Sequence, residues 1–474
     1  MTKAYPLDVG EAQFAEMVQI ATRELVRHLA TLPTQTLHAT GGGRALARSL
    51  REPMPEQGAD YETLVTNVIR RVVPRSFNTA SPGYLAYIPG GGLLPSAVAD
   101  LIASATNRYV GVWVAAPGLA QLESNVVRWF CEVVGYGDSP TPGGLLTSGG
   151  SMANLIGIVT AREDRLGEEH ARGVLYVSEQ AHHSVLKAAR FAGFRREQVS
   201  VVPSRDDFRI DVKELGRRMT DDARAGRRPF LVVGNAGTTN TGVVDDLPKL
   251  AALATKHRAW FHVDAAYGGF FALTKRGRRV LRGLSLADSV TLDPHKGLFL
   301  PYGTGALVVR SVRALKKAHA MTATYLPPMQ DEDDFVDFCD LGPELSREFR
   351  GLRVWLPMKL HGAKAFRDAL DEKLDLAREA CEAIRAMPGV EIACEPTLSL
   401  FAFRLVPKRD ESDLDAERRT RKVLQRVNAR QRVFLTGTKV AGRFLIRVCV
   451  LSFRTHRERM EMLIEDLGSA IART

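Results

Sequence analysis

The alternation of short apolar strands with amphipathic helices between residues 145 and 310 limits the fold of this chain more than any other feature. The apolar runs have the length of buried strands, and the segments between them repeat their apolar residues with helical spacing. Predicted strands span residues 175–177, 199–202, 230–233, 260–263, 289–292 and 306–309. Predicted helices span residues 152–165, 184–191, 212–224 and 247–257. This pattern predicts an α/β fold with a doubly wound sheet, which binds ligands beyond the carboxyl ends of its strands.

The segments on either side of this alternation predict two further units. Residues 1–80 predict a helical arm, because apolar side chains from Phe14 to Leu29 follow helical spacing and a proline ends the run. One amphipathic helix cannot bury its apolar stripe alone, so we expect the arm to pack on the main domain or on a second subunit. Residues 81–350 form the predicted large α/β domain, and residues 351–474 a smaller C-terminal α+β domain.

The charge balance of the chain argues against a nucleic-acid partner. Its 474 residues include 65 Lys and Arg and 54 Asp and Glu, so the formal net charge is +11. Basic residues alternate with acidic ones, and the sequence has neither a basic stripe interleaved with aromatic residues nor a nucleic-acid-binding motif. We therefore expect a solvated basic surface that helps anionic ligands to approach.

The cysteines and the apolar runs bear on the cellular compartment. The five cysteines have neither CxxC nor Cys/His spacing, which argues against a disulfide framework and against a zinc site. No apolar stretch reaches the length of about 18 residues that a membrane-spanning helix needs. The amino terminus lacks the apolar core of a signal peptide. We expect a protein of the reducing cytoplasm that binds no metal and no membrane.

Lys296 is the residue whose position is hardest to explain by folding alone. It stands between the predicted strands 289–292 and 306–309, directly after the polar turn Asp293-Pro294-His295. A lysine between two buried strands is unfavourable unless it is paired or chemically used. We therefore predict that Lys296 forms a Schiff base with an aldehyde cofactor.

Polar residues follow several other predicted strands. The segment 147–154 opens a helix, and its free N–H groups suit a phosphate. Asp264 ends an apolar strand and needs a cationic partner, such as a protonated pyridine nitrogen. Either His182 or His183 offers a flat ring for stacking. Each signal alone has a plainer explanation, namely an N-cap serine, a structural aspartate or a surface histidine. Together they form the set that pyridoxal phosphate requires.

These segments resemble the group II pyridoxal-phosphate-dependent amino acid decarboxylases, a family that includes aromatic amino acid, glutamate and diaminobutyrate decarboxylases. The resemblance rests on Ala-His-His-Ser (181–184), His-Val-Asp-Ala-Ala-Tyr (262–267) and Asp-Pro-His-Lys (293–296), in this order and spacing. It covers nearly the whole chain. It implies the fold type I aminotransferase-like architecture with a mixed, mostly parallel sheet, pyridoxal 5′-phosphate as cofactor, and a homodimer with active sites at the subunit interface.

The resemblance also implies roles for individual residues. Lys296 bears the cofactor, Asp264 pairs with the pyridine nitrogen, and His182 stacks on the ring. The implied cofactor-binding residues are Gly150, Ser151, Asn154, His182, Thr239, Asp264, Ala266, Asp293, His295 and Lys296. Close relatives often have asparagine where this chain has Asp293. The expected reaction converts an L-amino acid to an amine and CO2, with the cofactor ring accepting the electrons that CO2 leaves behind.

The source of the proton that completes this reaction stays open. In many family members a mobile loop carries a catalytic tyrosine, but residues 327–343 contain no tyrosine. Phe335 and Phe338 lie nearest to its expected position, and phenylalanine cannot donate a proton. Either His182 serves as the acid, or the reaction diverts to oxygen and yields an aldehyde, ammonia and peroxide.

The substrate and the class of function also leave alternatives. The acidic run 331–334 attracts basic substrates or is simply a solvated loop, the more common case. Ile88, Val110 and Val112 stand near positions that are often aromatic in aromatic-specific relatives, and glycines 90–92 remove side chains. Transamination and carbon–carbon lyase chemistry are less favoured. The alternative from another class is a non-catalytic basic binding protein, which predicts no cofactor on Lys296.

Overall fold

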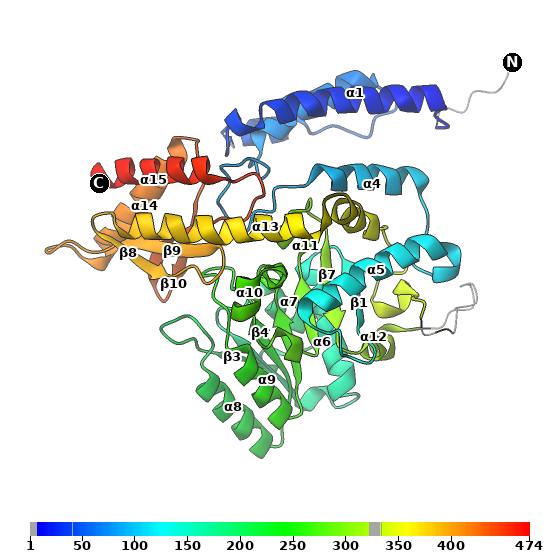
Figure 1. The fold of residues 1–474 in the computed structure, drawn as a ribbon, viewed down its shortest axis with the longest axis vertical. Helices are drawn as coiled ribbons and strands as arrows, with labels where there is room; N and C mark the ends of the chain where they lie inside the picture. The colour runs from blue at the N-terminus through cyan, green and yellow to red at the C-terminus, as the bar shows by residue number, and fades with distance from the viewer. Residues whose placement is uncertain (1–6, 40, 322–331, 333) are drawn as a thin grey trace.

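The computed structural model describes residues 7–39, 41–321, 332 and 334–474, and its largest feature is a seven-stranded sheet (Figure 1). The strands lie in the order β1-β7-β6-β5-β4-β2-β3. Their bounds are β1 (Gly143–Thr147), β2 (Gly173–Ser178), β3 (Val199–Val202), β4 (Arg228–Asn235), β5 (Trp260–Asp264), β6 (Ser289–Leu292) and β7 (Gly305–Val309). Neighbouring strands are parallel except where β7 pairs with β1 and β6. The sheet is therefore mixed and mostly parallel, as predicted.

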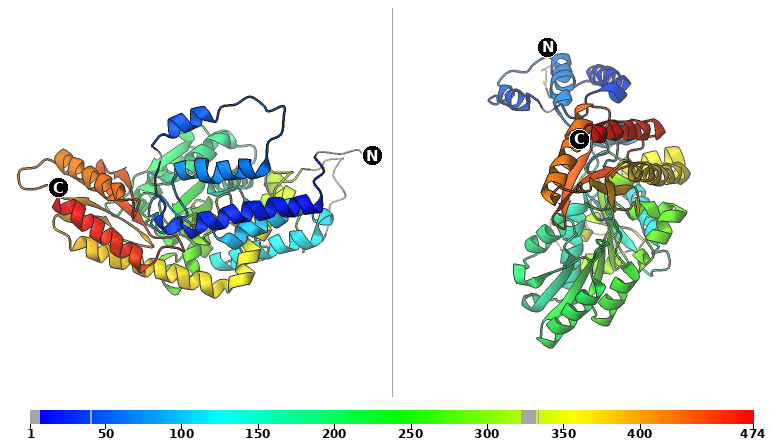
Figure 2. Two further views of the ribbon diagram at one scale, coloured as in Figure 1. Left: turned by 90° about the horizontal axis from the view of Figure 1, so that it is seen from above. Right: turned by 90° about the vertical axis from the view of Figure 1, so that its left-hand side faces the viewer.

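Helices cover both faces of this sheet, and its central strands are therefore buried on both sides (Figure 2). The helices that follow the strands are α6 (Gly150–Arg165), α7 (His183–Phe191), α8 (Val212–Arg224), α9 (Leu247–Lys256) and α12 (Val312–His319). On β2, Leu175 packs in the same cluster as Val185 of α7. The hydroxyl of the next residue, Tyr176, donates a 2.5 Å hydrogen bond to Asp222 of α8. Successive side chains of a strand point to opposite faces, so α7 and α8 cover different faces.

A smaller antiparallel sheet lies in the C-terminal part, with the order β10-β11-β9-β8. Its strands are β8 (Val390–Cys394), β9 (Leu400–Leu405), β10 (Thr436–Val440) and β11 (Arg443–Cys449). The helices around it are α13 (Gly351–Arg385), α14 (Asp413–Ala429) and α15 (Arg457–Ala472), which pack on side chains such as Phe401 and Phe403. In Figure 1 the long helix α13 passes over both parts of the chain. It departs from helical geometry at Gly362, where φ is 72°.

The N-terminal arm lies above the rest of the molecule in Figure 1 and in the right-hand view of Figure 2. Its helices are α1 (Glu11–Ala30), α2 (Gly43–Ser49) and α3 (Tyr61–Asn67), and α4 (Leu94–Thr106) and α5 (Pro117–Val134) follow. Glu24 of α1 is only 2% exposed and accepts a 2.8 Å hydrogen bond from Nε of Arg70, which joins the two ends of the arm. Several large apolar side chains of α1 and α3 stay exposed, among them Phe14, Val26 and Leu64.

The six strands and four helices predicted between residues 145 and 310 are confirmed. Strands β1 and β10 were not predicted. β1 contains two glycines, and it becomes a strand because it pairs with β7 in register from Gly143–Val309 to Thr147–Gly305. In the described ranges, no helix is both long and apolar enough to cross a bilayer, and no group of three or more His, Cys, Asp or Glu could hold a metal ion.

Candidate active site

A cavity of about 280 Å³ lies where β1, β2, β4, β5 and β6 end, and we call it the strand-end cavity. Segments that are far apart in the sequence line it. The lining residues are Ser148, Gly149, Gly150, Ser151, Met152, Asn154, His182, Ser184, Asn235, Gly237, Thr238, Thr239, Asp264, Ala266, Tyr267, Asp293, His295 and Lys296. All ten residues that the sequence analysis assigned to the cofactor are among them, so the fold brings the predicted set together.

Lys296 lies on α11 (Pro294–Gly297), a single helical turn that follows β6. Its Nζ is 2.8 Å from Oδ2 of Asp293, a residue that is only 2% exposed. Burial lowers the pKa of Lys296, but the charge and hydrogen bond of Asp293 outweigh it and leave that pKa raised. Oδ1 of Asp293 is buried and has no hydrogen-bond partner among the described residues. A buried, unsatisfied carboxylate oxygen is unfavourable, so this position favours a ligand that brings a donor.

Asp264 ends β5, and neighbouring groups fix its carboxylate. Oδ1 accepts a 3.1 Å hydrogen bond from the backbone N–H of Ala266, and Oδ2 accepts a 3.0 Å bond from Nδ2 of Asn154. A carboxylate can accept about four hydrogen bonds, so Asp264 retains capacity for one more donor. Asn154 lines the cavity from α6, but its amide is used to orient Asp264.

Asn154 is itself oriented by His262, a residue to which the sequence analysis gave no role. Nε2 of His262 lies 3.0 Å from Oδ1 of Asn154, and Nδ1 lies 2.7 Å from the hydroxyl of Ser289. Burial lowers the pKa of His262 to about 4, so the ring is neutral at neutral pH. Donation from Nε2 then sets the direction of the Asn154 amide. A chain of contacts thus runs from β6 to the carboxylate of Asp264.

His182 stands at the start of α7, where its ring caps the helix. Its Nδ1 accepts a 3.3 Å hydrogen bond from the backbone N–H of Ser184, whose hydroxyl is 2.7 Å away. Because a backbone N–H can only donate, the neutral ring carries its proton on Nε2. Burial lowers the pKa of His182, although the nearby charge of Asp264 opposes the change. His183 is exposed and its ring centroid lies 4.1 Å from that of His182, so only His182 lines the cavity.

The start of α6 offers backbone N–H groups to the same cavity. No side chain caps this helix, whose first residues, Gly150 and Ser151, line the cavity. The first N–H groups of a helix have no partner within it and favour an anion. A Cβ atom on Gly150 would lie 3.0 Å from Oδ2 of Asp293, so glycine keeps the helix start close to the Lys296 segment.

The glycine run 90–92 also lies against the Lys296 segment. A Cβ atom on Gly90 would lie 1.9 Å from the backbone oxygen of His295, which no larger residue could accommodate without a shift. The backbone N–H of Leu93 donates a 2.9 Å hydrogen bond to the oxygen of Phe299. The close backbone approach explains why glycine occupies position 90. The segment therefore packs directly on the turn that bears Lys296.

Two further residues near the cavity were missed. Tyr302 belongs to the loop after Lys296, and its ring centroid is 5.6 Å from that of His295. Arg447 of β11 is buried, donates a 3.1 Å hydrogen bond from Nε to the oxygen of Asn240, and also contacts the oxygen of Thr239. Position in the sequence could have suggested Tyr302, which follows the lysine closely. Nothing in the sequence connects Arg447 with Thr239, because the contact joins β11 to the loop after β4, two segments about 200 residues apart in the chain.

The two phenylalanines that stand nearest to the expected loop tyrosine do not line the strand-end cavity. Phe338 is 1% exposed, and the guanidinium of Arg347 lies 4.9 Å from its ring. The ring of Phe335 stacks on Trp113 at a centroid distance of 4.1 Å. Most of the preceding loop, with part of the acidic run 331–334, falls outside the described residues.

The residues near the expected substrate side are buried and aliphatic. Ile88, Val110 and Val112 are at most 8% exposed, and none of them lines the strand-end cavity.

The residues of the cavity fit pyridoxal 5′-phosphate group by group. An aldehyde requires an amine, which Lys296 supplies, and a protonated ring nitrogen requires a fixed carboxylate, which Asp264 supplies. A phosphate requires N–H and hydroxyl donors, which the uncapped start of α6 and Ser151 offer. The imidazole of His182 provides a flat surface for the ring.

Comparison with known proteins agrees with this fit. The model of the pyridoxal-dependent decarboxylase conserved domain matches residues 44–406. An aromatic-L-amino-acid decarboxylase of Bacillus atrophaeus is 33% identical over 455 residues, which cover 96% of this chain and 94% of that protein. The 4-hydroxyphenylacetaldehyde synthase of Rhodiola rosea is 26% identical and covers 98% of this chain and 96% of its own length. The crystal structure of Oryza sativa TDC with PLP and tryptamine superposes with a TM-score of 0.94 at 25% identity and covers 99% of each chain.

This chain belongs to the pyridoxal-dependent decarboxylase family. It is an amino acid carboxy-lyase of the fold type I architecture, and its cofactor is pyridoxal 5′-phosphate.

Proposed function

We propose that Lys296, Asp264 and His182 form the catalytic centre of this decarboxylase and that the product is an amine. The observation that carries the proposal is the convergence of an amine, a fixed carboxylate, an imidazole and a helix start in one cavity of about 280 Å³. Lys296 would hold the aldehyde carbon of the cofactor, and Asp264 its ring nitrogen. Gly150, Ser151 and His295 would surround the phosphate, with Thr239 and Ala266 beside the ring.

The bound cofactor supplies a protonated pyridine ring that accepts the electron pair left when CO2 departs. The protein residues provide the conditions for that step. Asp264 keeps the proton on the ring nitrogen, because Asn154 and the backbone of Ala266 hold its carboxylate in place. Asp293 holds the ammonium form of Lys296 until the cofactor arrives. In the loaded enzyme, the amine of Lys296 would be placed to move protons and to help to release the product.

We propose His182 as the group that returns a proton to the substrate carbon. Its neutral tautomer carries hydrogen on Nε2, and the hydrogen bonds at Nδ1 fix that tautomer. The sequence from 327 to 343 supplies no tyrosine, and Phe338 is buried beside Arg347. A proton from His182 would give the amine, and solvent would then return a proton to the imidazole ring of His182.

An aromatic L-amino acid is the substrate class that we propose to test first. The support comes from relatives whose names state aromatic substrates, including the Bacillus atrophaeus enzyme with 33% identity. The test follows CO2, amine and peroxide together from a panel of aromatic, acidic and basic L-amino acids. We expect one mole of amine for each mole of CO2 and no peroxide. Activity confined to acidic or basic amino acids would overturn the aromatic assignment.

Decarboxylation coupled to oxidative deamination is a second candidate. It is favoured by the absence of a tyrosine between residues 327 and 343 and by the Rhodiola rosea relative, whose name states an aldehyde product. This reaction consumes O2 and water and releases the aldehyde, CO2, ammonia and hydrogen peroxide. Peroxide in equal amount to CO2 would support it and would exclude a simple amine product. A non-catalytic basic binding protein would give neither product.

We further propose that two copies of the chain associate and that the protein is cytoplasmic. The exposed apolar side chains of α1, α3 and α4, such as Val26, Leu64 and Val98, would be covered by the second copy. Five free cysteines suit a reducing compartment. We propose that the domains are the arm (1–80), the large domain (81–350) and the small domain (351–474). Light scattering after size exclusion tests the dimer, and a monomeric mass would contradict it.

A further inference from the structure

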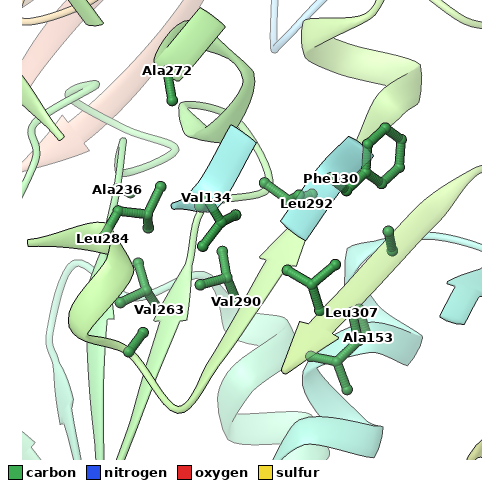
Figure 3. Packing of buried hydrophobic residues seen from close by; sticks show 14 of the residues in the cluster. Phe130, Val134, Ala153, Ala236, Val263, Ala272, Leu284, Val290, Leu292 and Leu307 are labelled. Atoms are coloured by element: carbon green, nitrogen blue, oxygen red, sulfur yellow. The ribbon is translucent and has the colours of Figure 1, made fainter. Parts of the chain in front are cut away.

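A second cavity, of about 590 Å³, lies away from the strand-end cavity, and we call it the arginine-rimmed cavity. It is enclosed by the end of α5, the segments 270–273 and 278–285, Leu298, and the part of α13 around Gly362. Figure 3 shows four of its wall residues, Phe130, Val134, Ala272 and Leu284, where they join the core packed on β5, β6 and β7. Its volume falls within the range of about 300–1,000 Å³ that is usual for small-molecule sites.

The walls of this cavity are apolar and its charges are cationic. Apolar wall residues include Trp129, Phe130, Phe270, Leu281, Leu284 and Met358. Three guanidinium groups, those of Arg278, Arg282 and Arg367, stand against one carboxylate, that of Glu132. Apolar walls with a cationic edge match a ligand that has an apolar body and an anionic end.

The arginines at the edge can bind an anion, although the charge of Arg282 also acts on Asp246. Arg278 and Arg282 are exposed, and neither has a carboxylate within 4.0 Å among the residues that the structure describes. Arg367 donates from Nε to the backbone oxygen of Leu273 at 3.2 Å, which leaves the two terminal nitrogens of its guanidinium. A guanidinium has five N–H donors in a planar fork that matches a carboxylate.

The cavity also lies against the segment that bears Lys296. A Cβ atom on Gly297 would be 2.7 Å from Cβ of Phe270, so the wall residue Phe270 touches the backbone directly after Lys296. Leu298, two residues after Lys296, is another wall residue. The opposite wall contains Ala363, next to the break in α13 at Gly362. Two features of the fold thus meet at this cavity, the Lys296 turn and the break in α13.

We propose that the arginine-rimmed cavity binds a small apolar carboxylate that lacks an amino group. The carboxylate pairs with Arg278 and Arg282, and the apolar body rests on Trp129, Val133 and Met358, wall residues that are only partly buried. An amine is disfavoured because three guanidinium groups outnumber the one carboxylate, that of Glu132, and a zwitterionic amino acid is disfavoured because its ammonium group would face the same cations. The site is therefore separate from the substrate site in both position and charge preference, and its existence does not depend on the proposed function.

The experiment titrates the holoenzyme with 4-phenylbutyrate and follows binding by calorimetry and by the fluorescence of Trp129, one of four tryptophans. We expect saturable binding at one site per chain. The double variant Arg278→Gln, Arg282→Gln weakens it by about tenfold or more, because hydrogen bonds to a charged group are lost. Arg190→Gln, at an exposed arginine of α7 outside this cavity, is the matched control and leaves binding unchanged. The neutral 4-phenylbutanamide binds as weakly as the acid binds to the double variant.

A variant that fills the cavity locates the site. Ala363 is exposed at the edge of the cavity, so Ala363→Trp adds a side chain without disturbing the core. We expect this variant to lose 4-phenylbutyrate binding and to keep the KM of decarboxylation. Absence of saturable binding to the wild-type chain, equal binding of acid and amide, or unchanged binding by Ala363→Trp would each overturn the proposal. If decarboxylation fails but the arginine-dependent binding persists, the proposed function falls and this site stands.

Discussion

The strand-end cavity and the arginine-rimmed cavity use charge in opposite ways. In the strand-end cavity, the charged groups are buried and fixed by neighbours, as Asp264 is by Asn154 and Lys296 by Asp293. In the arginine-rimmed cavity, the walls are apolar and Arg278 and Arg282 stand exposed at the edge. Fixed, desolvated charges can stabilise a changing charge during a reaction, whereas exposed cations beside an apolar wall can only select and hold a ligand. The comparison assigns catalysis to the first cavity and binding to the second.

Removing the amine of the strand-end cavity gives the largest expected effect. Lys296→Ala should lower kcat/KM by a factor on the order of 10⁴ or more, because no other residue can hold the cofactor aldehyde. Steady-state assays of amine release measure this loss. Thermal unfolding of the variant is the control, since a folded and inactive protein separates chemistry from stability. Activity within tenfold of wild type would contradict the role of Lys296.

Changing the carboxylate that we propose to pair with the ring nitrogen comes next. Asp264→Asn removes the charge and retains the shape, and we expect kcat to fall by about 10²–10³-fold. Asn154→Ala leaves the carboxylate but removes one of its two fixing bonds, and we expect about a tenfold fall. The order of the two losses is the test. A larger fall in kcat for Asn154→Ala than for Asp264→Asn would contradict the assignment of Asp264 as the partner of the ring nitrogen and Asn154 as the residue that orients it.

The pH dependence of cofactor capture tests the pairing of Lys296 with Asp293. Because the pKa of Lys296 is raised, its neutral, reactive amine forms only at a pH above the ordinary pKa range of lysine. The cofactor-free enzyme should therefore capture the cofactor faster as the pH rises through that raised pKa. In Asp293→Asn the carboxylate no longer raises the pKa while burial still lowers it, so the midpoint moves to lower pH. Stopped-flow absorbance after addition of pyridoxal phosphate measures the midpoint. An unchanged midpoint would rule out the pairing.

Packing around the strand-end cavity gives a smaller effect. Gly90→Ala places a Cβ atom 1.9 Å from the oxygen of His295, and we expect a loss of about 1–3 kcal/mol in the free energy of unfolding together with weaker cofactor binding. Gly137→Ala is the matched control, since a Cβ atom there meets nothing within 4 Å. Denaturant unfolding compares the two variants. Equal stability would show that the segment relaxes around the added methyl group.

The smallest effect is expected at the edge of the second cavity. Arg278→Gln should change the free energy of unfolding by no more than about 0.5 kcal/mol and leave kcat unaltered, because the side chain is exposed and away from the reacting groups. Unfolding curves and steady-state kinetics measure both quantities. A large fall in kcat would mean that the two cavities are not separate in function.

The sequence predicts the α/β part of this fold well because apolar periodicity is local. The six predicted strands and four helices between residues 145 and 310 show it, and Lys296, Asp264 and His182, which line one cavity, were singled out because each follows such a strand. β1 and β10 were missed because their glycines, and the lysine of β10, weaken the strand signal without the partner strands β7 and β11. The break of α13 at Gly362 was also not predicted.

Contacts between segments far apart in the sequence account for the rest. The path from Ser289 through His262 and Asn154 to Asp264 joins β6, β5 and α6, and the contact of Arg447 with Asn240 joins β11 to the loop after β4. The approach of Gly90 to His295 depends on backbone atoms, which no side-chain pattern reveals. The arginine-rimmed cavity has no motif, because its walls come from five separate segments. Such features follow from the packed fold and not from local spacing.

Reduction of the holoenzyme with sodium borohydride, followed by peptide mass spectrometry, tests the central claim most directly. The reaction fixes the bond between an amine and the cofactor aldehyde, so the labelled lysine identifies itself. We predict a pyridoxyl label on Lys296 and no label in Lys296→Ala. Labelling should be the same in the presence of 4-phenylbutyrate and in the Ala363→Trp variant. A label on a different lysine, or none at all in a protein that has taken up the cofactor, would contradict the account.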